Sequence, residues 1–557
     1  MRYWRRYVLA GLCGAFLLCF LIVPIALAIG AGFFDAGRPT TFWVVRVFTD
    51  LAARRGLINA VKIACATTAG VFVLALPLAV LAHQFDFRGK GVVTALLMVP
   101  LILPPFVGAL AMEKLLAQEG GSVNLILASL GLGKVDWRGG GLAMVVILEV
   151  LHLYPIMFLN ASAALANVDP TMVEAARNLG ASRWRTFWKV TMPLIRPGLF
   201  AGGTIVFIWS FTELGTPLMI GYRDVLPVQI YNGLQVTETS PRVFSMVFVM
   251  LSASAGLYAL GRVLFGRSAA ATVGRGVAAT VRRAGPLATA GIWLAFGAVT
   301  MLAVLPHVGV VLMSFAERWS GTILPTSYTL RHIHGVFTRS ETWQSIINSL
   351  QYASAATVID LVLGLAVAYL VVRLKVRGKG LLDSMAMLPL AVPGLVIASG
   401  YVALTRPGGP LEAIGPTRNP ALILIVAYSV RRLPYMVRSI SAGLQQTSET
   451  LEEAARNLGA TPLKSVLRIT VPLISANVLA GAMLAFSFAM LEVSDSLILA
   501  QTSQYYPITK AIYTLAGPAD TTNLAAALGS FGMVLLTVTL VLANLLLGKR
   551  LGALFRV

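Results

Sequence analysis

The sequence predicts an all-α membrane protein with about twelve transmembrane helices arranged as two homologous six-helix units. Three observations lead to this fold class. The 557 residues are 57% hydrophobic and 12% charged, with a mean hydropathy of +0.80, whereas soluble domains carry about 25% charged residues. Apolar segments of similar length recur along the whole chain, and the string EAARNLGA occurs twice, at 174–181 and 453–460.

Twelve apolar segments are each long enough to cross the roughly 30 Å hydrocarbon core of a bilayer. We expect helices, because a helix satisfies its own backbone hydrogen bonds in lipid. The predicted spans are 7–30, 57–83, 92–112, 141–166, 197–220, 243–265, 287–313, 346–371, 383–405, 420–444, 476–500 and 525–548.

The first span follows three arginines and has the charge pattern of a secretory signal. Its apolar run continues from Val8 to about Phe34, well beyond the roughly 7–15 residues of a signal core, so we expect an uncleaved helix. The chain has three cysteines, Cys13, Cys19 and Cys65, all within predicted spans. An odd number of buried cysteines predicts neither a disulfide framework nor a metal site.

The net charge of +21 is distributed unevenly over the connecting segments. With the amino terminus in the cytoplasm, the inner segments hold 25 Lys and Arg and the outer segments 15. This bias follows the positive-inside rule. It predicts a multi-pass membrane protein with both termini in the cytoplasm, and the basic charge requires no nucleic acid as a partner.

An internal repeat relates the two halves of the chain. FRGKG at 87–91 matches VRGKG at 376–380, and MVPLILP at 98–104 matches MLPLAVP at 387–393, both at an offset of 289. The repeated EAARNLGA string has an offset of 279. We therefore predict a first unit at 1–265 and a second at 287–557, joined by a basic cytoplasmic linker at 266–286.

A cytoplasmic loop before the fifth helix of each unit, at 167–197 and 446–475, contains the repeated string. Asp169 and Pro170 form a good helix start, and Gly180 can end the helix in the left-handed conformation. A second short helix is expected at 182–190, after which Pro193 and Pro197 redirect the chain into the bilayer.

The glutamates of the repeated string have a second interpretation. Thr171 with Glu174, and Thr450 with Glu453, have the spacing of a capping box. Capping explains one glutamate in each loop. It does not explain the repetition of the whole string with its glycine and proline spacing.

In both loops Glu-Ala-Ala is followed by a glycine and then by a proline at fixed distances, a pattern that resembles the EAA loop of bacterial ABC importer permeases. The resemblance covers both halves and implies the type I importer permease fold. It implies short coupling helices that seat in a groove of a separate ATPase. The positions that carry it are Glu174, Ala175, Ala176, Gly180 and Pro193, then Glu453, Ala454, Ala455, Gly459 and Pro472.

Two such loops imply two copies of an ABC ATPase subunit, together with a periplasmic or extracellular substrate-binding protein. A phosphate-binding loop needs G-x-x-x-x-G-K-[ST], and the Gly-Lys pairs at 89–90, 133–134 and 548–549 are followed by Gly, Val and Arg. We therefore expect a transport subunit and no enzyme. The chain is expected to bind no cofactor and no metal, and the partner ATPase to bind ATP and Mg²⁺.

Charged residues inside predicted spans are costly and mark candidate functional positions. Glu213 and Glu492 lie 279 residues apart, at equivalent places in the fifth helix of each unit, with Asp495 nearby and Arg431 and Arg432 in the tenth span. One hypothesis places these side chains along the translocation pathway. The alternative is a set of buried pairs, such as Glu492 with Arg431, that stabilise the bundle without touching substrate.

The fused layout and the segment RRLPYMVRS at 431–439 are similar to ferric-iron importer permeases. Fused permeases for 2-aminoethylphosphonate and thiamine share the layout and remain alternatives. A secondary transporter of the major facilitator type also has twelve helices, but the loop FDFRGKG at 85–91 does not match its G-x-x-x-D-R-x-G-R-R signature. A regulatory or scaffolding membrane protein with the same fold is a third possibility.

Overall fold

The computed structural model describes residues 3–547, apart from 36, 103, 138, 237–239, 270–281, 375 and 410. Within these residues the chain is largely helical, with three pairs of short strands. Most of the predicted linker and the carboxyl-terminal residues 548–557, both predicted to be cytoplasmic, lie outside the described residues.

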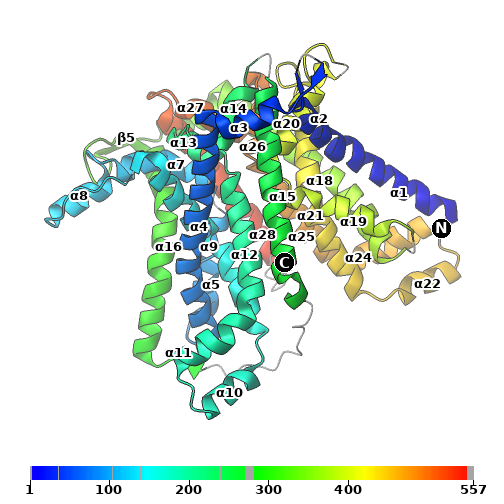
Figure 1. Cartoon of the computed structure of the whole chain (residues 1–557), viewed down its shortest axis with the longest axis horizontal. Coiled ribbons are helices and arrows are strands. Elements are labelled where there is room, and N and C mark those ends of the chain that lie inside the picture. Colours follow the sequence, from blue (N-terminus) through cyan, green and yellow to red (C-terminus); the bar gives the residue numbers. More distant parts are fainter. Residues whose placement is uncertain are drawn as a thin grey trace. The chain divides into compact units, whose positions relative to one another are not determined.

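The elements of the first half are shown in chain order in Figure 1. They are α1 Tyr3–Leu17, η1 Leu18–Ile22, α2 Val23–Ala31, β1 Phe34–Asp35, β2 Arg38–Pro39, α3 Phe42–Thr49, α4 Leu51–Gln84, β3 Phe85–Asp86, α5 Lys90–Leu96, α6 Val99–Ile102, α7 Pro105–Leu116, α8 Ser122–Ser129, η2 Gly139–Gly141, α9 Leu142–Ala166, α10 Pro170–Asn178, α11 Arg183–Thr186, η3 Phe187–Thr191, α12 Met192–Phe211, α13 Gly215–Ile220, α14 Leu226–Leu234 and α15 Pro241–Ala269.

The second half continues the same alternation of long and short helices. Its elements are β4 Arg282–Arg283, α16 Pro286–Phe315, β5 Ala316–Arg318, β6 Ser327–Tyr328, α17 Arg331–Thr338, α18 Ser340–Val372, α19 Lys379–Met387, η4 Leu388–Leu390, α20 Gly394–Leu404, η5 Glu412–Ile414, α21 Ala421–Gln446, α22 Thr450–Asn457, α23 Pro462–Ser465, η6 Val466–Thr470, α24 Val471–Leu473, α25 Ser475–Met490, α26 Ser494–Leu499, η7 Ser503–Tyr505, α27 Ile508–Ala516 and α28 Thr522–Leu547.

The helices agree with the predicted spans. Among the described residues, 8 helices are long and apolar enough to cross a membrane, or up to 11 if each bent pair of helices is one span. The remaining predicted span, 420–444, corresponds to the 26-residue helix α21, which carries Arg431, Arg432 and Arg438. Each of the twelve predicted segments therefore overlaps a helix or a bent pair. The fifth span of each repeat, predicted at 197–220 and 476–500, is interrupted after Phe211 and Met490.

The proline-rich segments bend the helices in some places and not in others. Helices Lys379–Leu390 and Gly394–Leu404 meet at 102°, and Pro462–Leu473 meets Ser475–Met490 at 80°. The prediction that Pro193 and Pro197 redirect the chain is wrong, because residues 183–211 run as one helical span. Pro193 directly follows the π-helical turn η3 and Met192 within this span, and a local π adjustment can accommodate a proline inside a membrane helix.

The chain packs into two compact units whose composition differs from the two sequence repeats. Among the described residues, unit 1 comprises 3–54, 229–251 and 331–547, and unit 2 comprises 55–228 and 252–330. In unit 1, α2 packs against α20, and α18 packs against α21 and α25. In unit 2, α9 packs against α12, and α7 against α16. The first helix of each repeat thus joins the unit that holds most of the other repeat.

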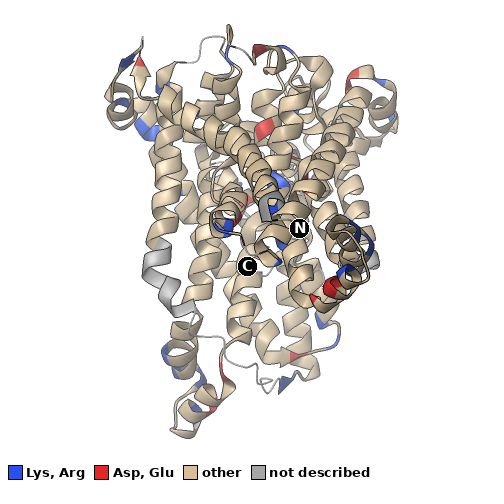
Figure 2. Cartoon of the chain, turned by 90° about the vertical axis from the view of Figure 1, so that its right-hand side faces the viewer, with Lys and Arg blue, Asp and Glu red and all other residues tan. Residues whose placement is uncertain are grey.

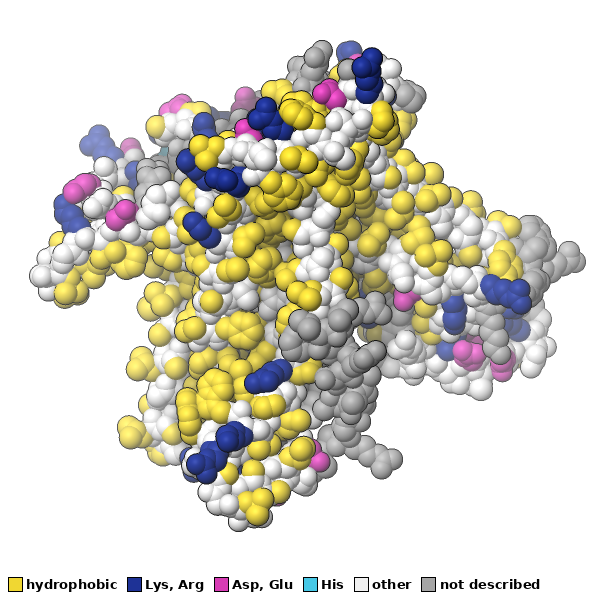
Figure 3. All heavy atoms as spheres, in the orientation of Figure 1, with side chains coloured by type: hydrophobic (Ala, Val, Ile, Leu, Met, Phe, Trp, Pro, Cys, Tyr) yellow, Lys and Arg dark blue, Asp and Glu magenta, His cyan; other side chains and the backbone are white. Residues whose placement is uncertain are grey.

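Each unit has its own buried apolar cluster and an apolar outer surface. Tyr154 and Phe296 lie in the cluster of unit 2. Hydrophobic side chains also cover the flanks of the long helices (Figure 3), and in α16 Leu294 and Met301 are each 75% exposed. Most charged residues lie toward the ends of the long helices (Figure 2). This distribution is suited to lipid around the helices and water at their ends.

Candidate coupling loops and buried polar clusters

The first loop contains the predicted short helix with its predicted boundaries. Helix α10 follows Asp169, whose Oδ1 accepts a hydrogen bond from the backbone N–H of Thr171 at 2.9 Å. These bonds from Thr171 lower the pKa of the Asp169 carboxyl, which keeps it ionised at the positive end of the helix. Gly180 ends the helix with φ +82°, as predicted, and the Ala181 N–H donates to the Ala176 carbonyl at 3.0 Å.

The second loop repeats this conformation. Gly459 has φ +87°, and the Ala460 N–H donates to the Ala455 carbonyl at 3.0 Å. The next short helix starts with a hydroxyl cap in each copy, Ser182 in α11 and Thr461 in α23. A five-residue π-helical turn, η3 or η6, follows in both loops. The sequence repeat is therefore also a repeat of local structure. In unit 2, α10 and α11 lie at one end of the long helices and α8 and α13 at the other (Figure 1).

The two loops expose the same positions. Glu174, Ala175, Gly180 and Pro193 are exposed and Ala176 is half-buried, and the same holds for Glu453, Ala454, Gly459, Pro472 and Ala455. Leu179 is 89% exposed and its counterpart Leu458 is 90% exposed. A large apolar side chain at the tip of a polar loop, present in both copies, is typical of a surface that a partner covers.

The capping-box alternative does not describe either loop. Asp169 caps α10, and the Ser448 hydroxyl accepts from the backbone N–H of Thr450 at the start of α22. The side-chain carboxylates of Glu174 and Glu453 make no hydrogen bond or ion pair with any other residue that the structure describes. Both carboxylates are therefore free to meet a partner.

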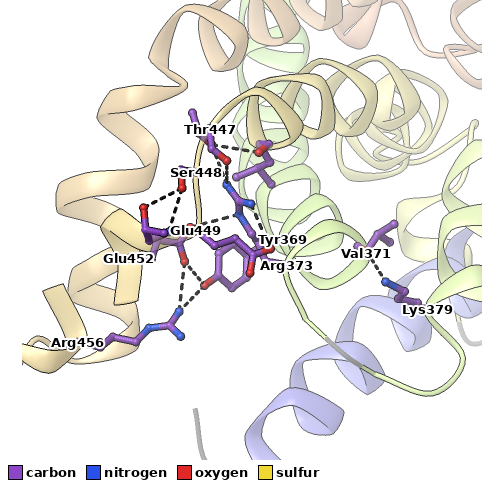
Figure 4. Close-up of polar contacts among 11 residues, drawn as sticks. Tyr369, Val371, Arg373, Lys379, Thr447, Ser448, Glu449, Glu452 and Arg456 are labelled. Carbon is purple, nitrogen blue, oxygen red and sulfur yellow. Dashed lines mark hydrogen bonds and ion pairs between the residues drawn. The ribbon is translucent and has the colours of Figure 1, made fainter. Parts of the chain in front are cut away.

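Glu452, directly before the motif glutamate of the second loop, is buried, and sequence analysis missed it. The Tyr369 hydroxyl donates to Glu452 Oε2 at 2.7 Å, and Arg456 Nη2 donates to the same oxygen at 3.2 Å and to the Tyr369 oxygen at 2.8 Å (Figure 4). Tyr369 lies near the end of α18, so Glu452 connects the loop to that helix.

Arg373, at the end of α18, makes the other contacts of this network. Its Nε lies 3.4 Å from Glu452 Oε1 and its Nη1 3.3 Å from Glu449 Oε1, while Nη2 donates to the Thr447 carbonyl at 2.7 Å (Figure 4). The Arg373 guanidinium thus contacts three residues of the second loop, Thr447, Glu449 and Glu452. We call Tyr369, Arg373, Glu452 and Arg456 the loop network.

Four of the five predicted pathway residues meet in unit 1. Glu492 lies in the break between α25 and α26 and pairs with both Arg431 and Arg432 of α21. Arg431 also lies 3.4 Å from Asp495. Gly394 packs directly against the Arg431 guanidinium and leaves no room for a Cβ. The predicted pairing of Glu492 with Arg431 is confirmed, in a cluster where both acids are buried.

Glu213 lies in unit 2, in the matching break between α12 and α13. Its Oε1 accepts a hydrogen bond from the Thr216 N–H at 3.1 Å, which caps α13. Unit 2 also buries Glu149, which accepts from Thr67 and Ser210. The fifth helix is thus interrupted at an equivalent glutamate in both repeats.

Sequence analysis missed one further buried acid. Asp360 of α18 accepts a hydrogen bond from Ser429 of α21 at 2.7 Å and is fully buried. It is the sole carboxylate within the apolar segment 346–371, and that isolation was the signal available in the sequence.

Lys510 of α27 lies outside the predicted spans and is surrounded by tyrosines. Its Nζ donates to the Leu497 carbonyl at 3.0 Å and lies 5.6–5.9 Å from the ring centroids of Tyr231, Tyr506 and Tyr513. Lys510 is 5% exposed. Burial lowers the pKa of its ammonium from 10.5 to about 8, because desolvation disfavours the charged form.

We expect Lys510 to make stability depend on pH between about 8 and 10.5. In this window the unfolded chain binds the proton more tightly than the folded chain, so unfolding becomes less favourable as pH rises. Lys510→Met is expected to remove this part of the rise, as measured by thermal unfolding in detergent across pH 7.5–10.5 (about the span of the two pKa values). The exposed Lys134 supplies the control Lys134→Met. Equal pH slopes for wild type and Lys510→Met would contradict the expectation.

Residues 73–269 and 360–552 match the family described as binding-protein-dependent transport system inner membrane component. The chain belongs to this family. It is an ABC importer permease with two family units in one polypeptide, a transport subunit of the membrane. The match sets aside the alternative of a major facilitator transporter.

Three relatives indicate the range of transport systems that resemble this permease. It is 28% identical to the putative ferric transport system permease protein of Haemophilus influenzae, over 89% of this chain and 78% of the relative. It is 29% identical to the ferric transport system permease protein of Actinobacillus pleuropneumoniae, over 81% and 64%. A probable molybdenum ABC transporter permease of Haloferax volcanii is 31% identical, over 46% of this chain and 91% of the relative.

Proposed function

We propose that this permease imports ferric iron and is driven by two ATPase subunits that dock on the loops 167–197 and 446–475. The observation that carries the docking proposal is the paired exposure of Leu179 and Leu458 beside the unpartnered Glu174 and Glu453. An exposed leucine gains about 1.5–3 kcal/mol when a partner buries it. Two loops with the same exposed positions favour two copies of one ATPase subunit, which bind the ATP and Mg²⁺.

The orientation of the chain in the membrane follows from the docking proposal. The loops face the cytoplasm, where the ATPase is, and the charge bias of the connecting segments agrees with this side. Both termini of the chain are then cytoplasmic. A binding protein delivers the cargo to the opposite side of the membrane.

We place the route of the cargo beside the broken fifth helices, at Glu213, Glu492, Asp495, Arg431 and Arg432. Charged groups within a membrane bundle are costly and are found where they serve a pathway or pair with one another. Glu492 and Asp495 already pair with the arginines, so these groups also stabilise unit 1. Carboxylate oxygens are suited to a hard cation such as Fe³⁺.

Ferric iron is the proposed cargo because two of the relatives are ferric transport permeases and match most of this chain. The molybdenum relative matches less than half of it. Molybdate, 2-aminoethylphosphonate and thiamine are the competing cargoes for the test.

The test is ATP hydrolysis by the permease reconstituted in proteoliposomes with its ATPase and its binding protein. We expect the Fe³⁺-loaded binding protein to stimulate hydrolysis about tenfold, which corresponds to about 1.4 kcal/mol in the activation barrier. Binding protein incubated with molybdate, 2-aminoethylphosphonate or thiamine is expected to leave the rate at the level of the empty protein. Stimulation by one of these ligands and not by Fe³⁺ would refute ferric iron as the cargo.

A further inference from the structure

The second loop makes side-chain contacts with the end of α18, and in the residues that the structure describes the first loop lacks the equivalent contacts with α4. The loop network of the second loop uses Tyr369, Arg373 and Glu452, together with Arg456. The offset of the repeat is 289 residues at α18 and 279 at the loop. Tyr369, Arg373 and Glu452 therefore correspond to Val80, Gln84 and Val173 in the first half. Arg456 corresponds to Arg177, so the first half keeps one of the four residues.

The structure shows the effect of these replacements. Arg373 is 7% exposed and Glu452 6% exposed as side chains, and a buried pair of this kind has a restricted geometry. In the first half Gln84 and Arg177 are exposed. Within the described part of the chain, no side chain of α10 makes a hydrogen bond or ion pair with α4.

The loop network also joins the second loop to the centre of unit 1. Arg373 ends α18, and α18 packs along α21 and α25, the helices that carry the buried charge cluster. A displacement of the second loop therefore reaches these helices through rigid contacts. Among the described residues, the first loop instead contacts unit 2 through apolar side chains such as Val168, Met192 and Ile195, without the ion pairs of the second loop.

We propose that the loop network makes the two ATPase contacts unequal, with Glu452 and Arg373 as positioning residues that transmit the movement of the second loop to α18. This proposal rests on the proposed ATPase docking and assigns these residues a separate task. Glu453 and Leu458 hold the ATPase, whereas Glu452 and Arg373 hold the loop to the membrane helices.

The test compares two neighbouring glutamates in the reconstituted complex. Glu452→Gln keeps the size of the side chain and a hydrogen bond to Tyr369 but removes the charge that pairs with Arg373. We expect substrate transported per ATP hydrolysed to fall about fivefold to tenfold, while the ATPase still co-elutes with the permease. Arg373→Gln should give the same loss, and the double variant no further loss, because the two residues act as one unit.

Two matched variants separate transmission from docking. Glu453→Gln is expected to weaken co-elution of the ATPase, and Gln84→Ala, at the exposed position equivalent to Arg373 in the first half and outside both loops, to leave transport per ATP near wild type. Tyr369→Phe removes a single hydroxyl and replaces Glu452→Gln and Arg373→Gln in the test if those variants do not fold. We expect it to lower transport per ATP about twofold to threefold.

Two results would overturn the proposal: wild-type transport per ATP in the Glu452→Gln and Arg373→Gln double variant, or loss of ATPase co-elution in Glu452→Gln. If the wild-type permease itself fails to retain an ATPase, the proposed docking fails. That outcome is distinct, because it is visible before any variant is made.

Discussion

We expect the double substitution Leu179→Asp and Leu458→Asp to lower the affinity for the ATPase at least about 100-fold. Each leucine is about nine-tenths exposed in the chain alone, and its burial by a partner is worth about 1.5–3 kcal/mol. Loss of two such contacts amounts to about 3–6 kcal/mol, and each factor of ten in affinity is about 1.4 kcal/mol. Co-elution and equilibrium binding of the purified ATPase measure the change.

The same substitution is expected to leave the fold intact, because an exposed side chain contributes little to stability. Leu330→Asp is the matched control. Leu330 is 68% exposed and lies between the predicted spans 287–313 and 346–371. With the amino terminus in the cytoplasm, this segment is on the outer side, so the ATPase should still bind. Unchanged binding by the Leu179 and Leu458 double variant would show that the loops are not the docking sites.

The second large effect is expected at Glu492. Glu492→Ala leaves Arg431 and Arg432 without the carboxylate that both contact in the interior of unit 1. Removal of one partner from a buried ion pair costs about 3–5 kcal/mol, because the remaining charge is desolvated and unpaired. A marked fall in the thermal unfolding midpoint in detergent is the expected result.

Glu412→Ala is the control for this prediction, because Glu412 pairs with Arg418 at the surface and surface pairs contribute little. Equal unfolding midpoints for the two variants would contradict the interpretation of the charge cluster.

The pathway proposal needs substitutions that keep the size of the side chain, so uptake is measured with Glu213→Gln and Glu492→Gln combined. Normal uptake by that variant would remove both glutamates from the pathway.

The local structure of the loops was predictable because it depends on neighbouring residues. Asp169 before Pro170 specifies a helix start, and a glycine after the helix specifies its end. The repeat extends the same prediction to the second loop, since Gly180 and Gly459 have the same left-handed conformation. Spans were predictable for the same reason, because the length of an apolar run is a local property.

Contacts between distant segments were not predictable in this way. Glu452 stands next to the motif glutamate, and its burial depends on Tyr369 and Arg373, which lie about 80 residues earlier. A comparison of the halves at these positions could have found it, since Val80, Gln84 and Val173 replace all three. Asp360 was overlooked because its partner Ser429 is on another helix.

The make-up of unit 1 has a consequence for the synthesis of the chain. Leu17 of the first span belongs to the same buried cluster as Leu370 and Leu433. At about 5–20 residues per second of translation, those partners emerge roughly 20–80 s after the first span. During this interval the span must persist in the bilayer without them. Its hydropathy of 2.8 is the highest among the candidate spans of the described chain, which suits a helix that must reside alone in lipid until its neighbours are made.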